Sequence, residues 1–308
     1  MKKNILAISV GRSDYDRYLP ILDELRKKKN IKLTLFLSNA HYNNNLGYTA
    51  AYVSEKFNII KNNKSKKLND ISFSFYEDLK FLSSKINKIK PDIMIVLGDR
   101  YEMFMGPLIA TPKNIPIVHF YGGAVSEGAI DELIRHAITK MSHFHFVALE
   151  KYKKRLIQLG EEKWRIKNIG LHQLKDLKAN SKKSITELSK KFNFDFSNPY
   201  ALMTFHPTTI ELSKLKNQLQ LLTKAIKKTK LNIVITYPNA DPKYNEIIYF
   251  LKKNFKNKFK YKIVKNLGKD FYPSVMKNCE LVIGNSSGGI VEASSLKKPA
   301  INIGTRQD

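Results

Sequence analysis

Polar residues that could do chemistry gather in this 308-residue chain directly after apolar runs. The most compact group is the segment 284–289, GNSSGG, which follows the run LVI and precedes IVEASSL. Small and hydroxyl residues that lead into a helix expose backbone N–H groups, which can bind an anion. A tight turn with a serine N-cap would use the same residues. The segment alone therefore leaves an anion site and a plain turn open.

Five further loops of this kind follow apolar runs. They are GRSDYD at 11–16, GDRYE at 98–102, YGGAVSEGAIDE at 121–132, FHPTT at 205–209 and GTRQ at 304–307. Arginine, serine and backbone N–H groups can hold a diphosphate, and Asp, Glu and His can move protons. Together the loops predict a site for an anionic substrate with proton-transfer chemistry.

Each of these residues also fits an ordinary structural role when it is taken singly. Asp99 fits a helix N-cap. Glu127 and Asp131 fit first-turn acids that a helix dipole stabilises. His206, before a proline, fits a hydrogen-bonded loop histidine. Arg12 and Arg306 fit surface arginines, so the prediction rests on the recurrence of such residues at strand ends.

The elements that must position these loops alternate between β-rich and amphipathic segments. The apolar runs contain Val, Ile and Leu without clean alternation, as strands that are covered on both faces do. This pattern predicts doubly wound α/β domains. The expected strands are Ile5–Val10, Lys32–Ser38, Ile93–Leu97, Ile117–Phe120, Phe144–Leu149, Arg165–Ile169, Ala201–Phe205, Ile233–Tyr237, Tyr261–Val264, Leu281–Ile283 and Ile301–Ile303.

A polar stretch divides this pattern in two. We expect a Rossmann-like domain over 1–177, a linker region over 178–198, and a second Rossmann-like domain over 199–308. The carboxyl ends of parallel strands are where such domains bind ligands, so a cleft between the two domains is the expected site.

Composition limits the classes of function. The chain contains no run of 18 or more apolar residues, so we expect no membrane span. Its single cysteine, Cys279, excludes an internal disulfide and fits a buried residue of a cytoplasmic protein. The net charge of +27 would suit a nucleic-acid binder. However, the lysines lack interleaved aromatic residues, so we interpret them as solvated surface that attracts acidic ligands.

The wording of several segments resembles one known family. The segments EGAIDELIRHAITKMSHFHFVA, GDRYEM, FHPTT, GNSSGGIVEAS and INIGTRQ closely resemble the UDP-N-acetylglucosamine 2-epimerases. Within that family they are most similar to the hydrolysing branch, which serves sialic and legionaminic acid synthesis. The resemblance spans nearly the whole chain.

The resemblance implies a GT-B-like pair of Rossmann-type domains that bind a UDP-sugar. Members eliminate UDP across C1–C2 of the sugar, and water then adds with inverted configuration at C2. The products are UDP and the free manno-configured sugar, and no redox cofactor or metal is required. The substrate would be UDP-N-acetylglucosamine or UDP-2,4-diacetamido-trideoxyglucose, and a homodimer or homotetramer is expected, with no nucleic-acid or membrane partner.

The resemblance also implies residue roles. The catalytic positions of the family match Asp99, Asp131 and His206, with Glu127 at the acidic position of the branch. The UDP-binding positions match Arg12, Ser286, Ser287, Gly288, Glu292 and Arg306. Glu292 would bind the ribose hydroxyls and the serines would bind phosphate oxygens.

The chain departs from the family at several positions. Ala124 follows the paired glycines where many relatives have an acid, and Tyr121 stands where others have a glutamate. The first loop is GRSDYD where GTRADY is more usual, and the chain ends before the C-terminal helices that relatives carry. These departures leave a catalytically weakened UDP-sugar-binding relative open as an alternative. A non-hydrolysing epimerase is a further alternative, although its members usually carry HxEAGLR where this chain has HFYGGAV.

Overall fold

The computed structural model describes residues 2–44, 48–62, 71–126, 129–239 and 241–307. The chain divides into two compact units, and each is described by itself. The first unit comprises Met1–Val125 and Ile130–Gln173, and the second comprises Ser126–Ala129 and Leu174–Asp308. We call them unit 1 and unit 2.

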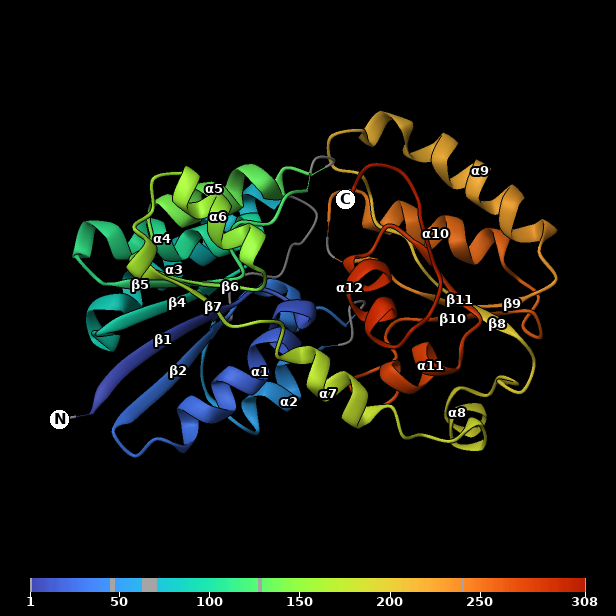
Figure 1. Cartoon of the computed structure of the whole chain (residues 1–308), viewed down its shortest axis with the longest axis horizontal. Helices are drawn as coiled ribbons and strands as arrows, with labels where there is room; N and C mark the ends of the chain where they lie inside the picture. Colours follow the sequence, from blue (N-terminus) through green and yellow to red (C-terminus); the bar gives the residue numbers. More distant parts are fainter. Residues whose placement is uncertain (1, 45–47, 63–70, 127–128, 240, 308) are drawn as a thin grey trace. The chain divides into compact units, whose positions relative to one another are not determined.

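Unit 1 is built on a seven-stranded sheet with the order β3-β2-β1-β4-β5-β6-β7, in which all pairings are parallel. Its strands are β1 (Lys3–Ser9), β2 (Ile31–Leu37), β3 (Asn58–Lys61), β4 (Ile93–Leu97), β5 (Ile117–Phe120), β6 (Phe144–Val147) and β7 (Ile166–Asn168). Its helices are α1 (Arg12–Lys27), α2 (Ala50–Ser54), α3 (Ile71–Ile89), α4 (Met105–Ala110), α5 (Asp131–Lys140) and α6 (Glu150–Gln158). Helices α1 and α2 cover one face of the sheet, and α3 to α6 cover the other (Figure 1).

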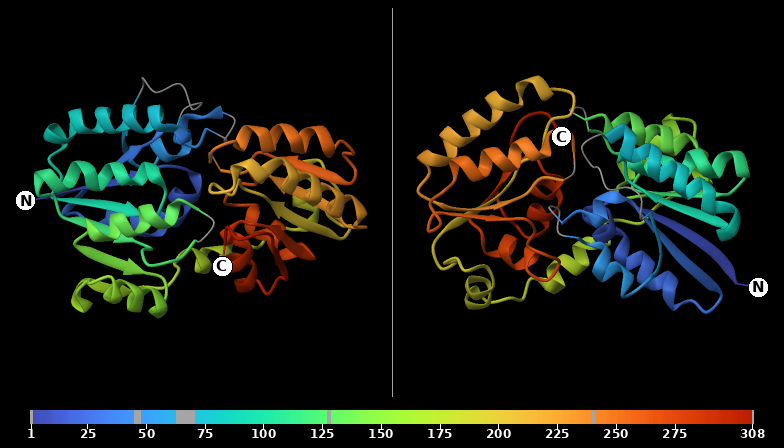
Figure 2. Two further views of the ribbon diagram at one scale, coloured as in Figure 1. Left: turned by 90° about the horizontal axis from the view of Figure 1, so that it is seen from above. Right: turned by 180° about the vertical axis from the view of Figure 1, so that it is seen from behind.

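Unit 2 repeats this plan with five parallel strands in the order β10-β9-β8-β11-β12. The strands are β8 (Tyr200–Thr204), β9 (Asn232–Thr236), β10 (Tyr261–Val264), β11 (Leu281–Gly284) and β12 (Ala300–Asn302). The helices are α7 (Gln173–Asn180), α8 (Ile185–Phe192), α9 (Leu215–Lys228), α10 (Tyr244–Asn254), α11 (Tyr272–Asn278) and α12 (Ser287–Ser295). Helices α9 and α10 run side by side on one face (Figures 1 and 2), and α11 and α12 lie on the other.

Both sheets confirm the predicted doubly wound α/β class. Every expected strand forms within two residues of its predicted limits. The central strands β1 and β4 are mostly buried, as strands covered on both faces are, whereas the edge strands β7 and β12 are largely exposed. Strand β3 was not predicted. It has four residues, NIIK, at the edge of its sheet, and none of them is fully buried.

Residues 178–198, which we expected to be a linker, include the end of α7, the whole of α8 and the loops that flank α8. Ser184 and Glu187 form a capping box at the start of α8. Leu188, Phe194 and Phe196 are buried in a hydrophobic cluster with Tyr200 and Cys279. Burial raises the pKa of the Cys279 thiol to about 11, as fits a buried residue. These buried apolar side chains hold the segment against the rest of unit 2. The sequence did not reveal them because they are scattered among Lys, Ser and Asn residues.

The described helices include none that is long and apolar enough to cross a membrane.

Gly284 allows strands β8 and β11 to meet closely at their carboxyl ends. Its φ is +138°, and a Cβ atom there would lie 1.8 Å from the backbone oxygen of Thr204, its partner in the register. No side chain fits in that space, so both the dihedral angle and the contact require glycine.

Gly284→Ala should therefore destabilise unit 2 by more than about 3 kcal/mol, measured by urea unfolding. Gly289→Ala is the matched control, because a Cβ there meets only ordinary contacts at 3.8 Å or more within α12. That control should be neutral or stabilising by about 0.5–1 kcal/mol. A Gly284→Ala protein as stable as the control would contradict the steric argument.

Candidate active site

Asp99 lies just after β4 and is paired with a buried arginine. Its Oδ2 accepts a hydrogen bond from Nη2 of Arg135, whose side chain is 2% exposed. Nη1 of Arg135 donates to the backbone oxygen of Ala124 at 2.8 Å. The short 3₁₀ helix that follows, Tyr101–Phe104, has Arg100 at its N-cap and no side-chain cap. Asp99 therefore serves an ion pair and not a helix cap.

The charges around Asp99 set its protonation state. Burial alone would raise the pKa of its carboxyl, but the cations of Arg135, Arg17 and Arg100 outweigh burial and hold the pKa below its usual range. Asp99 is therefore ionised at neutral pH. A carboxylate of this kind is a permanent negative charge and a weak base.

His119, at the third position of β5, fixes the loop that carries Asp99. A carbonyl can only accept, so Nε2 of His119 donates to the Gly98 oxygen at 2.8 Å, and Nδ1 accepts from Thr139 Oγ1 at 3.2 Å. Burial lowers the pKa of His119 to about 3. The imidazole is neutral and structural, and the sequence analysis did not single it out.

The other predicted residues of unit 1 lie at helix starts. Arg12 is the first residue of α1, is partly exposed, and forms no ion pair with any described carboxylate. Asp131 is the first residue of α5, four positions before Arg135, where a first-turn acid is favourable. Glu127 lies outside the described residues.

In unit 2, His206 is bound to Asn285 by two reciprocal hydrogen bonds. The His206 backbone N–H donates to Asn285 Oδ1 at 2.7 Å, and Asn285 Nδ2 donates to the His206 oxygen at 2.8 Å. Asn285 has no exposed surface. The pair joins the loop after β8 to the loop after β11, so FHPTT and GNSSGG form one structure.

The imidazole of His206 lies in a charged cluster. The backbone N–H of Asn239 donates to His206 Nδ1 at 3.2 Å, which fixes Nε2 as the protonated nitrogen of the neutral ring. Asp241 Oδ2 lies 3.7 Å from His206 Nδ1 and 3.6 Å from Arg306 Nη2. Arg306 also donates to the Asn285 oxygen at 3.1 Å. The predicted residues His206 and Arg306 are thus brought together through Asp241 and Asn285.

The GNSSGG loop opens helix α12. Ser286 is the N-cap, and its hydroxyl accepts from the Gly288 N–H at 3.4 Å, while Ser287 is the first helical residue. Tyr272 Oη donates to Glu292 Oε2 at 2.8 Å. A Cβ on Gly288 would lie 2.7 Å from Glu292 Oε2 and 2.8 Å from Tyr272 Oη, so a larger residue would displace the ends of these two side chains. The serine N-cap is therefore present in this loop, and the anion site stays a prediction.

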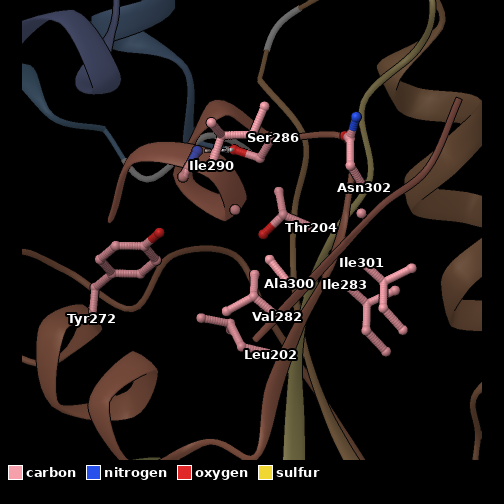
Figure 3. Close-up of a pocket in the computed structure, with 13 residues that line it drawn as sticks. Leu202, Thr204, Tyr272, Val282, Ile283, Ser286, Ile290, Ala300, Ile301 and Asn302 are labelled. Carbon is pink, nitrogen blue, oxygen red and sulfur yellow. Dashed lines mark hydrogen bonds between the residues drawn. The ribbon is translucent and has the colours of Figure 1, made fainter. Parts of the chain in front are cut away.

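A pocket of about 230 Å³ adjoins this loop within unit 2. Leu202, Val282 and Ala300 of the sheet form an apolar wall, and Tyr272 and Ser286 supply polar groups (Figure 3). Among the described residues, no group of three or more His, Cys, Asp or Glu side chains could hold a metal ion.

Arg135, Asn285 and Tyr272 were missed by the sequence analysis, although two carried a signal. Arg135 is four residues after Asp131 on a predicted helix, so a shared face could be read from the spacing. Asn285 stands between a buried strand and a serine N-cap, where a buried amide must bind backbone. Tyr272 is distant in sequence from Glu292, and nothing in the spacing indicates their contact.

Comparison with known proteins gives one family. The family described as UDP-N-acetylglucosamine 2-epimerase matches residues 23–308. A GDP/UDP-N,N'-diacetylbacillosamine 2-epimerase (hydrolyzing) of Campylobacter jejuni is 35% identical over 99% of this chain and 81% of its own length. Polysialic acid biosynthesis protein P7 of Escherichia coli is 33% identical over 99% of this chain and 79% of its own length.

Solved structures agree on the fold. The Neisseria meningitidis UDP-GlcNAc 2-epimerase bound to UDP-GlcNAc has a TM-score of 0.78 at 19% identity, covering 97% of this chain and 82% of that one. The Methanocaldococcus jannaschii UDP-GlcNAc 2-epimerase in complex with UDP-GlcNAc and UDP has a TM-score of 0.77 at 22% identity, covering 99% and 84%.

The Asp99–Arg135 pair can be tested by a double-mutant cycle. Arg135→Gln should cost about 2–3 kcal/mol of unfolding free energy at pH 7, below the ~3–5 kcal/mol of fully buried pairs, because the Asp99 side chain is 29% exposed. Adding Asp99→Asn should restore part of the loss. The cost should shrink as pH falls through the folded pKa of Asp99, since a lowered carboxyl pKa contributes stability only above that range.

Arg26→Gln is the control for this cycle, because Arg26 forms an exposed pair with Asp23 on α1. It should change the unfolding free energy by less than about 1 kcal/mol. Strictly additive effects of Arg135→Gln and Asp99→Asn would show that the two side chains are not coupled.

Proposed function

The chain belongs to the UDP-N-acetylglucosamine 2-epimerase family, and we propose that it is a hydrolysing UDP-sugar 2-epimerase that releases UDP and the free manno-configured sugar. The observation that carries this proposal is the identity of 35% over 99% of the chain with a relative named as a hydrolysing epimerase. A second relative with that name, from Legionella pneumophila, is 29% identical over the whole chain. The elimination and hydration use side chains alone.

We assign UDP binding to unit 2. The start of α12 carries the Ser286 and Ser287 hydroxyls, and the positive end of a helix dipole favours a phosphate group. Arg306 and the Nε2–H of His206 add positive charge and a donor beside the same loop. These groups would stabilise the charge that develops on UDP as it leaves. Arg12 of unit 1 is a further cation for the diphosphate.

Glu292 is the proposed ribose ligand. A carboxylate binds a pair of hydroxyls well when it is held still, and the Tyr272 hydroxyl holds Oε2 from the other side at 2.8 Å. Gly288 leaves the space for this contact.

We assign the sugar chemistry to Asp99 and Asp131 of unit 1 and to His206, with Glu127 as a further carboxylate. Removal of the C2 proton needs a positioned base, and Asp99 is the proposed one. Its pairing with Arg135 makes it a weak base. The stabilisation of departing UDP must therefore supply much of the driving force for elimination.

The sugar is either N-acetylglucosamine or its 2,4-diacetamido-trideoxy relative. The names of the relatives from C. jejuni and L. pneumophila favour the second. Either product would enter the synthesis of a sialic or legionaminic acid. The work would be done in the cytoplasm, where nucleotide sugars are made.

We also propose a homo-oligomer. Phe73 and Tyr76 of α3 are about half exposed, at 51% and 52%, and Leu108 of α4 is 38% exposed. Helices α3 and α4 are in contact, so these side chains offer an apolar face for a second copy. A monomer in light scattering at micromolar concentration would overturn this part of the proposal.

Incubation with each UDP-sugar and ¹H NMR of the products tests the proposed reaction. We expect UDP and a free manno-configured sugar, with deuterium at C2 when the reaction runs in D₂O. A UDP-linked manno sugar that persists would instead identify a non-hydrolysing epimerase. Binding of UDP without turnover of either substrate would identify a weakened relative.

Ser287→Ala and Glu292→Ala should each weaken UDP binding by about 10- to 150-fold, because each removes a hydrogen bond with a charged group worth ~1.5–3 kcal/mol. Calorimetric titration with UDP measures the change. Tyr272→Phe, which keeps Glu292, should weaken binding less than Glu292→Ala. Unchanged UDP affinity in both alanine variants would remove the assignment of UDP to this loop.

A further inference from the structure

Two buried polar atoms at the start of α1 have no hydrogen-bond partner. Asp14 is 6% exposed and Tyr18, one turn later, is fully buried. Neither Asp14 Oδ2 nor Tyr18 Oη is bonded to any described residue. An unpartnered buried carboxylate oxygen is costly, so the carboxyl either holds a proton or meets a group that arrives later.

Asp14 lies in the charged group that contains Asp99. Strand β1 pairs with β4, with Ile5 opposite Ile93, so the loops after these strands meet at one edge of the sheet. The charges that act on Asp14 are Arg17 of its own helix and Asp99, Arg100 and Glu102 after β4.

Both nearby acids already have arginine partners. Arg100 binds Glu102 through Nε at 3.2 Å and Nη2 at 3.1 Å, and both side chains are nearly buried. Asp99 is bonded to Arg135. Asp14 differs from these two acids, because its Oδ2 accepts no hydrogen bond from the described part of the chain.

The pKa values of the Asp14 and Asp99 carboxyls are shifted in opposite directions. Burial raises the pKa of Asp14 to about 7, although Arg100 and Arg17 oppose the rise. The pKa of Asp99 is held below its usual range. At neutral pH one carboxyl carries a proton in a large share of molecules while the other is ionised, which is how an enzyme divides acid and base roles between like groups.

We propose that Asp14 is a proton-donating residue of this site, acting beside the ionised Asp99; the proposal rests on the function proposed above. Inversion at C2 needs a base on one face of the sugar and an acid on the other, and Asp14 is the acid.

Asp99 and Asp14 together account for every proton that moves in the proposed reaction. In the elimination, Asp99 takes the C2 proton, the C2–H electrons form the C1=C2 bond, and the C1–O electrons leave with UDP. In the hydration, the C1=C2 electrons take the Asp14 proton to C2 while a water oxygen bonds to C1. The proton lost by that water restores Asp14, and Asp99 releases its proton to solvent.

Asp14→Asn is the test, because the amide keeps the size of the side chain and cannot release a proton. We expect formation of the free manno-configured sugar to fall by about 10²- to 10³-fold, with the unsaturated elimination product accumulating and UDP affinity unchanged. Wild-type turnover should fall as pH rises through about 7, and the residual rate of the variant should lack that decline. Asp23→Asn, on the same helix and partly exposed, is the matched control and should keep wild-type turnover and pH profile.

Thermal unfolding separates this role from a structural one. The folded pKa of Asp14 is above its unfolded value of about 3.9, so its contribution to stability is full below that value and is lost as pH rises through about 7. Asp14→Asn should therefore have a Tm equal to or above that of wild type at pH 8, with the advantage absent at pH 4.5. A variant that is less stable at both pH values would show that Asp14 is a structural acid and overturn the proposal.

Two kinetic outcomes remain distinguishable. Full turnover with an unchanged pH profile in Asp14→Asn would overturn the role of Asp14 and leave the proposed function intact. Absence of UDP release by the wild-type protein from either UDP-sugar would overturn both.

Discussion

The contact between β8 and β11 constrains the loops at the carboxyl ends of these two strands in unit 2. Gly284 lets the two strand ends approach until the Thr204 carbonyl occupies the space of a side chain. That approach brings Asn285 within reach of both backbone groups of His206. Through this one amide, the loop with the histidine and the loop with the serines share a single rigid base, to which Arg306 is also bonded. The phosphate site proposed for these loops would need such a base, since small displacements weaken every contact at once.

Unit 1 organises charge in a different way. Its strand ends hold acids and arginines in nearly closed ion pairs, and the neutral His119 ties the Asp99 loop to β5. Fixed charges of this kind need no reorganisation when a reaction moves charge. They also explain why Asp99, in the loop after β4, and Asp14, in helix α1, differ in protonation, because Asp99 has an arginine partner and Asp14 is buried without one.

The sequence predicted the fold class because the buried central strands of each sheet leave apolar runs that can be recognised without knowing their partners. It did not predict β3, a four-residue strand at the edge of its sheet with no fully buried residue. Strand ends located the loops with Asp99, His206 and GNSSGG. Contacts distant in the chain, such as Tyr272 with Glu292, leave no local pattern. Asp14 lies in the loop GRSDYD and in the first turn of α1. Acids in a first helical turn are ordinarily solvated, so its burial becomes visible only in the packed structure.

Cys279 gives the molecule a property that neither its chemistry nor its ligands require. It is the single thiol of the chain, it has no exposed surface, and it belongs to the core of unit 2. A thiol reagent can react with it only when that core opens, so the alkylation rate in native buffer reports the opening of unit 2 and is silent on unit 1. Cys279 is thus a built-in probe with which local opening of unit 2 can be followed without an added label.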